Sequence, residues 1–241
     1  MDIKSVFILG STSLIAKELC LILAKKGCRR FHLISRDYEK NEFLVNKLKI
    51  KYQANVTQEI VDLNNSDSSK DSLPYVEDYD LYLITAGTLG NNKLAEINIK
   101  EAQRITNVNY YSLIPWIMSI ANKNRLNKKS NLWIFSSVAS DRGRPSNYIY
   151  GAAKAALTTF CEGLIAKTYN KPFKIRLIKA GFMLTPMSEG KVPDLLCISP
   201  KKVVNVLLRN CRKSGIEYLP RWWFFVMQMI RILPVRFISK L

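Results

Sequence analysis

Histidine is almost absent from this chain of 241 residues, which has a single one, His32, inside an apolar run. The five cysteines are scattered, with no CxxC pair and no other spacing typical of metal ligands. We therefore expect no metal centre. An odd, unpatterned set of cysteines also indicates reduced, mostly packed thiols and a cytoplasmic protein.

The sequence also lacks a run of eighteen apolar residues, so we expect no membrane-spanning helix. The apolar stretch over residues 4–9 superficially resembles part of a signal peptide. Gly10 and Ser11 interrupt it, which favours a buried strand that feeds a helix. With 48% hydrophobic residues, and no repeat or low-complexity segment, we expect one globular domain.

Acidic residues are scarce: 19 Asp and Glu stand against 37 Lys and Arg, which gives a net charge of +18. Such a charge suits nucleic acid, an anionic membrane surface or phosphate-bearing ligands. The basic residues are dispersed and do not alternate with aromatic residues before the C-terminus, so we expect no nucleic-acid partner. A basic, solvated surface without a specific partner is the alternative.

The hydrophobic pattern predicts strands alternating with helices. Strands are expected over residues 4–9, 30–34, 55–62, 80–85, 132–137, 173–179 and 216–219. Helices are expected over residues 13–26, 99–122 and 200–212, and after Tyr148. The first strand, helix and strand form a βαβ unit, which crosses over right-handed and makes a parallel sheet. We therefore predict an α/β fold with a Rossmann-type doubly wound sheet of six to seven strands over residues 1–220, with residues 221–241 as a tail of the same domain.

The turn after the first strand lies where a dinucleotide pyrophosphate would meet a helix N-terminus. The usual fingerprint has three glycines, and here only Gly10 is kept. Backbone N–H groups and hydroxyls in the turn could still bind phosphate, whereas an ordinary strand-to-helix turn is the alternative. The coenzyme residues predicted here are Gly10, Ser11, Thr12, Ser13, Leu14 and Ile15.

The second strand ends in Ser35-Arg36-Asp37. An acidic residue at this tip would bind the adenosine ribose of NAD, whereas an arginine suits the 2′-phosphate of NADP. Arg36 therefore favours NADP over NAD, although Asp37 lies close and Arg36 could be one more surface base. Further coenzyme contacts are expected from Asp62 and Leu63 at an adenine pocket, and from Ala86 and Gly87 beside a flat ligand.

A tyrosine and a lysine lie four residues apart, on one face of the helix expected after Tyr148: Tyr150 and Lys154. A nearby cation favours the phenolate and lowers the pKa of a tyrosine. Ser137, at the preceding strand end, could face both groups. Asn109 is expected inside a helix, where asparagine is unfavourable, and suggests a buried polar relay; a capped kink before Pro115 is the structural alternative.

With these motifs the chain resembles the short-chain dehydrogenase/reductase family over nearly its whole length. The resemblance implies that Tyr150 is the general acid or base, that Lys154 holds the nicotinamide ribose, that Ser137 positions the carbonyl and that Asn109 supports a water relay. It also implies nicotinamide contacts from Gly181, Phe182 and Thr185. Family members usually have Pro-Gly where this chain has Ala180-Gly181, and the first glycine motif has lost two glycines.

Within the family, the loop ASDRGR of residues 139–144 and the motif NYIYG of residues 147–151 look most like reductases of decaprenylphosphoryl-2-keto-pentose. This resemblance implies a keto-sugar substrate, with or without a polyprenyl-phosphate link, for cell-envelope polysaccharide synthesis. Ser137, Arg142, Arg144 and Tyr150 would contact it. The alternatives are a reductase of a soluble ketone or 3-oxoacyl substrate, and a non-catalytic NADP-binding regulatory protein.

The tail combines tryptophan, phenylalanine and arginine, and nine consecutive residues, 222–230, carry no charge. This is too short to span a bilayer but suits its interface. We therefore expect either peripheral contact of residues 221–241 with an anionic membrane surface, at the inner face of the cell membrane, or a helix packed on the core or in a dimer contact. The small residues after Tyr150 suggest a homodimer or homotetramer.

Overall fold

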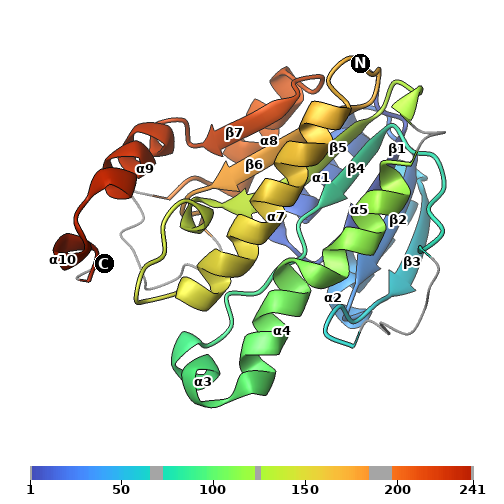
Figure 1. Cartoon of the computed structure of the whole chain (residues 1–241). Helices are drawn as coiled ribbons and strands as arrows, with labels where there is room; N and C mark the ends of the chain where they lie inside the picture. Colours follow the sequence, from blue (N-terminus) through green and yellow to red (C-terminus); the bar gives the residue numbers. More distant parts are fainter. Residues whose placement is uncertain (1, 66–72, 123–125, 185–196, 240–241) are drawn as a thin grey trace.

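The computed structural model describes residues 2–65, 73–122, 126–184 and 197–239, and within them seven parallel strands form one sheet in the order β3-β2-β1-β4-β5-β6-β7 (Figure 1). The strands are β1 (Ser5–Leu9), β2 (Arg30–Ser35), β3 (Asn55–Ile60), β4 (Leu81–Ile84), β5 (Asn131–Ser137), β6 (Lys174–Ala180) and β7 (Gly215–Leu219). The order reverses between β1 and β4, which is the switch point of a doubly wound fold. The expected α/β class is confirmed.

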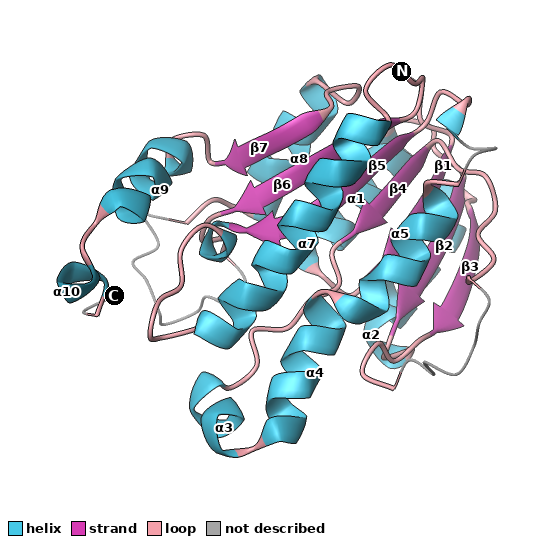
Figure 2. Ribbon diagram, in the orientation of Figure 1, coloured by secondary structure: helices cyan, strands magenta, loops and turns pink. Residues whose placement is uncertain are grey.

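Helices cover both faces of the sheet (Figure 2). One face carries α1 (Leu14–Lys25), α2 (Glu39–Tyr52) and α8 (Pro200–Arg209), and the other carries α4 (Ile99–Asn109), α5 (Ile114–Ile120) and α7 (Tyr148–Lys167). The shorter elements are α3 (Asn92–Ile97), η1 (Tyr111–Leu113), η2 (Val138–Ser140), α9 (Trp223–Ile232) and α10 (Val235–Ile238). Among the described helices, none combines the length and the apolar character needed to cross a membrane.

The single long helix expected over residues 99–122 is wrong. The chain leaves the helical conformation at Tyr110, where φ is −144° and ψ −71°, and continues through η1 into α5. Pro115 lies in the first turn of α5, where its missing N–H costs no helical hydrogen bond. The structure therefore has the break before Pro115 that the alternative reading of this segment expected.

Two further differences concern helix ends and a helix that the pattern did not indicate. Helix α2 was not expected, because its segment is rich in lysine and buries only the four side chains of Asn41, Leu44, Val45 and Leu48. Helix α8 ends at Arg209 rather than at residue 212. Neither difference changes the sheet.

A buried ion pair joins the last two strands. Arg176 on β6 donates from Nε to Glu217 on β7 at 2.8 Å, and both side chains are almost fully buried. Arg176 also donates to the carbonyl oxygens of Leu207 and Asn210 at 3.0 and 3.2 Å, which satisfies the end of α8. Burial raises the pKa of Glu217, but hydrogen bonds from Lys213 and Arg176 outweigh it and the pKa lies below its usual value.

Gly10 offers a test of the strand junction. Its φ of +97° is unfavourable for other residues, and a Cβ at this position would lie 2.4 Å from the backbone nitrogen of Ala86. Gly10→Ala is expected to lower the free energy of unfolding by about 2 kcal/mol or more, measured by urea denaturation. Gly163→Ala is the matched control, because nothing lies within 4 Å of its added Cβ in helix α7. It should be neutral or stabilise the protein by up to about 1 kcal/mol, and equal losses in the two variants would contradict the close approach at Gly10.

Candidate active site

A cleft of about 570 Å³ lies at the carboxyl ends of the strands, beside the switch between β1 and β4. Parallel sheets of this kind bind ligands at that position. Most of the expected coenzyme residues line it: Gly10, Thr12, Ser13, Leu14, Ile15, Arg36, Asp62, Leu63, Ala86, Gly87, Tyr150 and Lys154. The structure therefore brings together groups from five distant parts of the sequence.

The turn at Gly10 places a helix N-terminus against the cleft. Ser13 caps α1, its hydroxyl accepting from the N–H of Ala16 at 3.1 Å, and the same hydroxyl donates to that of Thr85 at 3.0 Å. Thr85 in turn donates to the carbonyl oxygen of Gly10 at 2.9 Å. The first N–H groups of a helix have no partner within it, so the start of α1 suits a phosphate.

Ser11 differs from its neighbours because its side chain is fully buried. Its hydroxyl donates to the carbonyl oxygen of Ile34 at 3.1 Å and accepts from Asn41 at 2.6 Å. Asn41 also donates to the hydroxyl of Ser35 at 2.8 Å. The Ser11 side chain thus faces the protein interior, where it joins the turn to β2 and α2, and does not line the cleft.

The far end of the cleft is basic. Arg36 is exposed at its rim, and Lys40 and Lys17, which the sequence patterns did not single out, line it as well. The carboxylate of Asp37 pairs with Lys40 at 2.8 Å, and hydrogen bonds from Lys40 hold the pKa of Asp37 below its usual value. Lys40 could have been found from its spacing, because a residue three positions after an acidic residue at a helix start faces it.

Tyr150 lines the other end of the cleft, and the expected partner Ser137 hydrogen-bonds its phenol without itself lining the cleft. Burial raises the pKa of the Tyr150 phenol, and a hydrogen bond with Ser137 and the positive charge of Arg144 offset this only in part. Ser137 also accepts from the N–H of Ala139 at 3.1 Å, which fixes its hydroxyl at the start of η2. The pKa of Tyr150 is therefore raised and not lowered as its spacing from Lys154 led us to expect, because burial outweighs the neighbouring groups. The phenol keeps its proton at neutral pH and can act as an acid.

Lys154 lies behind Tyr150 and is 4% exposed. Its Nζ donates to the carbonyl oxygen of Phe135 at 3.2 Å and lies 6.0 Å from the centre of the Tyr150 ring. Burial lowers the pKa of Lys154 to about 8. A Cβ added at Gly87 would lie 3.3 Å from this ammonium, so the glycine leaves room for the lysine in the cleft wall.

Asn109 is fully buried at the end of α4. Its amide nitrogen donates to the carbonyl oxygens of Thr88 and Ile105 at 2.7 and 2.8 Å, and its side-chain oxygen accepts from the N–H of Thr88 at 3.1 Å. That oxygen lies 2.9 Å from a Cβ built at Gly87, next to Lys154. Asn109 thus ends its helix, holds the Thr88 loop and adjoins the lysine.

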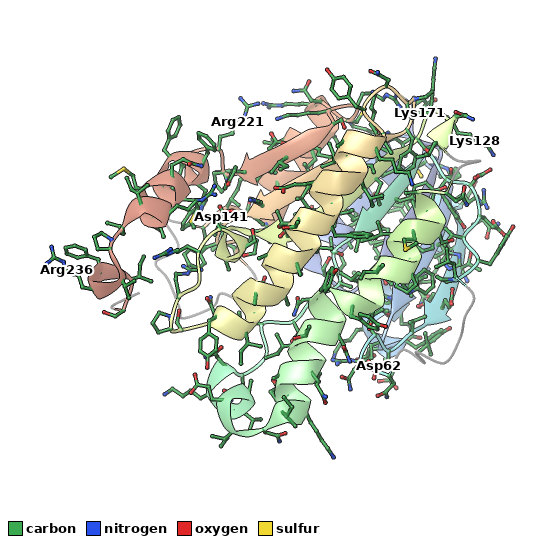
Figure 3. The ribbon with its side chains drawn as sticks, in the orientation of Figure 1. Asp62, Lys128, Asp141, Lys171, Arg221 and Arg236 are labelled. Atoms are coloured by element: carbon green, nitrogen blue, oxygen red, sulfur yellow. The ribbon has the colours of Figure 1, made fainter. Side chains whose placement is uncertain are left out.

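A second network anchors the loop after η2. Asp141, labelled in Figure 3, accepts from Lys179 at 2.5 Å with one oxygen and from the hydroxyl of Tyr218 at 2.9 Å with the other. Lys179 and Tyr218 lie on β6 and β7, so the loop is fastened to the last two strands. Sequence reasoning gave Asp141 no role, because its partners follow it by 38 and 77 positions.

The loop carries the two arginines expected at the substrate. Arg142 is half-buried, and so is Arg144. Burial lowers the pKa of Arg144, its charge acts on Tyr150, and its Nε is buried with no hydrogen-bond partner among the described residues. Arg144 therefore adjoins the phenol, whereas no described contact places Arg142 there.

The loop after β6 departs from the expected arrangement. A Cβ on Gly181 would overlap the Trp223 ring, and Phe182 meets the same ring edge-to-face at 5.4 Å between centroids. Neither residue lines the cleft, whereas Met183 does. Thr185 lies outside the described residues.

Comparison with known proteins identifies the class. The description "short chain dehydrogenase" matches residues 4–195. A Mycobacterium tuberculosis protein named Uncharacterized oxidoreductase Rv2073c is 31% identical over 162 residues, which are 66% of this chain and 64% of that protein, so this chain spans less than two thirds of that relative. The NADP-dependent 3-hydroxy acid dehydrogenase of Schizosaccharomyces pombe is 24% identical over 193 residues, 78% of this chain and 74% of that protein.

The fold is also found in solved structures. A short chain dehydrogenase from Shigella flexneri, complexed with NADP, superposes with a TM-score of 0.74 at 19% identity and covers 89% of this chain and 95% of its own. Together with the matched residues 4–195, these comparisons show that the chain belongs to the short chain dehydrogenase family.

The buried lysine predicts a pH dependence of stability. The pKa of Lys154 is about 8 when folded, below the value of about 10.4 of a free lysine. The unfolded chain therefore binds more protons between these values, so folding gains stability as the pH rises. Relative to Lys154→Met, the wild-type protein should gain about 1–3 kcal/mol of unfolding free energy between about pH 7 and pH 10 in urea titrations without coenzyme.

An exposed lysine provides the control for the loss of charge, Lys171→Met. The gain with pH should be absent when this variant is compared with wild type. If the difference in unfolding free energy between wild type and Lys154→Met stays constant across the same pH range, the low pKa of Lys154 is wrong.

Proposed function

We propose that the protein is an NAD(P)H-dependent reductase that transfers hydride to a ketone, with Tyr150 as general acid. The observation that carries this proposal is one continuous cleft, with a helix N-terminus and basic rim at one end and Tyr150 and Lys154 at the other. The Gly10 turn, which packs directly on the backbone of Ala86, and the small residues Ala86 and Gly87 in the cleft wall fit a dinucleotide. A reduced nicotinamide would supply the hydride.

The residues at the end of the cleft would handle the proton. Tyr150, whose raised pKa keeps the phenol protonated, donates to the carbonyl oxygen as negative charge develops there. Ser137 contributes a hydrogen bond to the same oxygen. Lys154, whose pKa of about 8 leaves it mostly protonated at neutral pH, supplies a cation that stabilises the phenolate left after proton transfer.

The basic rim favours NADP over NAD. Arg36 lies beyond the end of β2, at the position where a 2′-phosphate would be bound, with Lys40 and Lys17 nearby. Asp37, the residue that could instead have bound a ribose, is already paired with Lys40. The Schizosaccharomyces pombe relative is named as NADP-dependent, which agrees with this preference.

For the substrate, the loop of Arg142 and Arg144 supports an anionic keto compound. The half-buried Arg144 has an Nε without a partner among the described residues and stands beside the proton donor, so a phosphate-bearing keto-sugar could bind there. We propose a keto-sugar that is polyprenyl-phosphate-linked, as the resemblance to decaprenylphosphoryl-2-keto-pentose reductases implies. A soluble ketone or 3-oxoacyl substrate is the alternative within the same reaction, and a non-catalytic NADP-binding protein is the alternative outside it.

We also propose a homodimer or homotetramer for the assembled enzyme. The exposed face of α7 carries small side chains, including Ala152 and Ala166. Small residues allow another helix to approach closely, so this face suits contact with a second copy.

Tyr150→Phe tests the reaction. Loss of the hydroxyl should lower kcat at least about hundredfold while the dissociation constant for NADPH, measured by fluorescence, stays within about twofold. Tyr148→Phe, an exposed neighbour on the same helix, is the matched control and should keep full activity. A panel of a soluble ketone, a 3-oxoacyl thioester and a phosphorylated keto-pentose would rank the substrate classes. If the wild-type protein binds neither NADPH nor NADH, the reductase proposal fails.

Arg36→Ala tests the coenzyme preference. Removing a charged contact to a 2′-phosphate should raise the dissociation constant for NADPH about tenfold or more and leave that for NADH unchanged. Lys49→Ala, an exposed lysine on α2, should alter neither value. Equal weakening of both coenzymes by Arg36→Ala would show that Arg36 does not read the 2′-phosphate.

A further inference from the structure

The C-terminal helices present an apolar surface to solvent at the edge of the molecule. Figures 1 and 2 show α9 and α10 beyond β7, apart from the helices that cover the sheet. We call this surface the tail surface. Its exposed apolar side chains are Trp222, Phe224, Phe225, Met229, Ile232, Val235 and Phe237.

The opposite side of α9 is what holds the helix to the protein. Trp223 and Met227, one turn apart, are buried against Val138 and Phe182. In contrast, Phe225 is 70% exposed and Ile232 75%. Helix α9 is therefore apolar on two sides, and packing on the core accounts for only one of them.

The charged side chains of the tail itself are all positive. Arg221, labelled in Figure 3, Arg231 and Arg236 are exposed beside the apolar side chains, and residues 218–241 contain no aspartate or glutamate. Among the described residues, Arg221 pairs with Glu217 at 3.9 Å, and the other partners of Glu217 are Arg176 and Lys213. The surface thus combines exposed aromatic groups with unbalanced positive charge.

We propose that the tail surface docks on an anionic lipid bilayer, with the apolar side chains of α9 and α10 in the interface and the arginines at the headgroups. Tryptophan and phenylalanine favour this boundary, and arginine is attracted to anionic lipid. A second copy of the chain fits less well. In a symmetric contact each arginine would meet the same basic surface, which offers no carboxylate of its own to pair with it.

The same helix contacts segments that adjoin the proposed active site, so docking on a bilayer would also position that site relative to the lipid. Trp223 packs on Gly181 and Phe182 in the loop after β6, and the buried cluster that it forms includes Val138 in η2, directly after Ser137. Docking would therefore hold the mouth of the site near the lipid surface. The docking itself does not depend on the proposed reaction.

Cosedimentation of the full chain with vesicles tests the proposal. Binding should be at least about tenfold stronger to phosphatidylcholine vesicles with about one third phosphatidylglycerol than to phosphatidylcholine alone, and should fall in about 1 M salt. The double variant Phe225→Ser with Met229→Ser should lower binding about tenfold or more, because two exposed apolar side chains no longer enter the interface. Arg231→Gln with Arg236→Gln should weaken binding to the anionic vesicles about tenfold and hardly change binding to neutral ones.

Phe43→Ser with Ile50→Ser is the matched control, because these side chains are 78% and 82% exposed on α2. It should bind vesicles as the wild type does. Equal effects of the two apolar double variants, or no binding of the folded wild-type chain to anionic vesicles, would overturn the proposal. So would dissociation of an oligomer by Phe225→Ser with Met229→Ser in sedimentation velocity while vesicle binding is unchanged, since the occupant would then be a second copy.

NADPH binding, measured on the same preparations, separates this proposal from the reductase proposal. Vesicle binding without coenzyme binding would sustain the docking and refute the reductase. Coenzyme binding and turnover without vesicle binding would sustain the reductase proposal and refute the docking.

Discussion

The close approach of two backbone segments, the Gly10 turn and Ala86 after β4, is the constraint on which the coenzyme cleft depends. β1 and β4 are neighbours at the point where the strand order reverses. The segments that follow these two strands leave the sheet side by side, with no side chain between their backbones. With φ of +97° and a Cβ position 2.4 Å from the nitrogen of Ala86, Gly10 has no substitute in this geometry. The two other glycines of the usual motif are dispensable by comparison, because Ser13 and Thr85 link the same segments through their hydroxyls.

Local patterns were sufficient for the sheet and insufficient for some of the helices. Buried parallel strands are short apolar runs that stand out between polar turns, so each strand could be located. Helix α2 was missed because lysines dominate its segment, and only its four buried side chains show the spacing of a helix. The segment over residues 99–122 was misread because its helical periodicity continues through Tyr110, whereas the Asn109 side chain donates to the helix carbonyl oxygen of Ile105 and to the Thr88 loop. Such side-chain hydrogen bonds are invisible to periodicity.

The candidate site shows the same limit. Tyr150 and Lys154 could be paired from their spacing alone, since four positions on a helix set them on one face. Ser11 could not be separated from Ser13, because burial beneath the turn depends on Asn41, which lies 30 positions further on. Gly181 and Phe182 were assigned to the nicotinamide by resemblance, and the structure turns them toward Trp223, whose position depends on the packing of the tail. Contacts over long sequence separations decide these cases.

The anchoring of Asp141 by Lys179 and Tyr218 has a consequence for how specificity can change in this protein. Both ends of the following loop are fixed: Asp141 is held by the two last strands, and Asn147 leads into α7 through the hydrogen bond from the N–H of Gly151 at 2.8 Å. The residues between them, which include both arginines, can vary in sequence without disturbing either attachment. The segment between the two anchors could therefore be replaced in a relative with the same anchors, which would change the groups beside the cleft while Tyr150 and Lys154 stay in place.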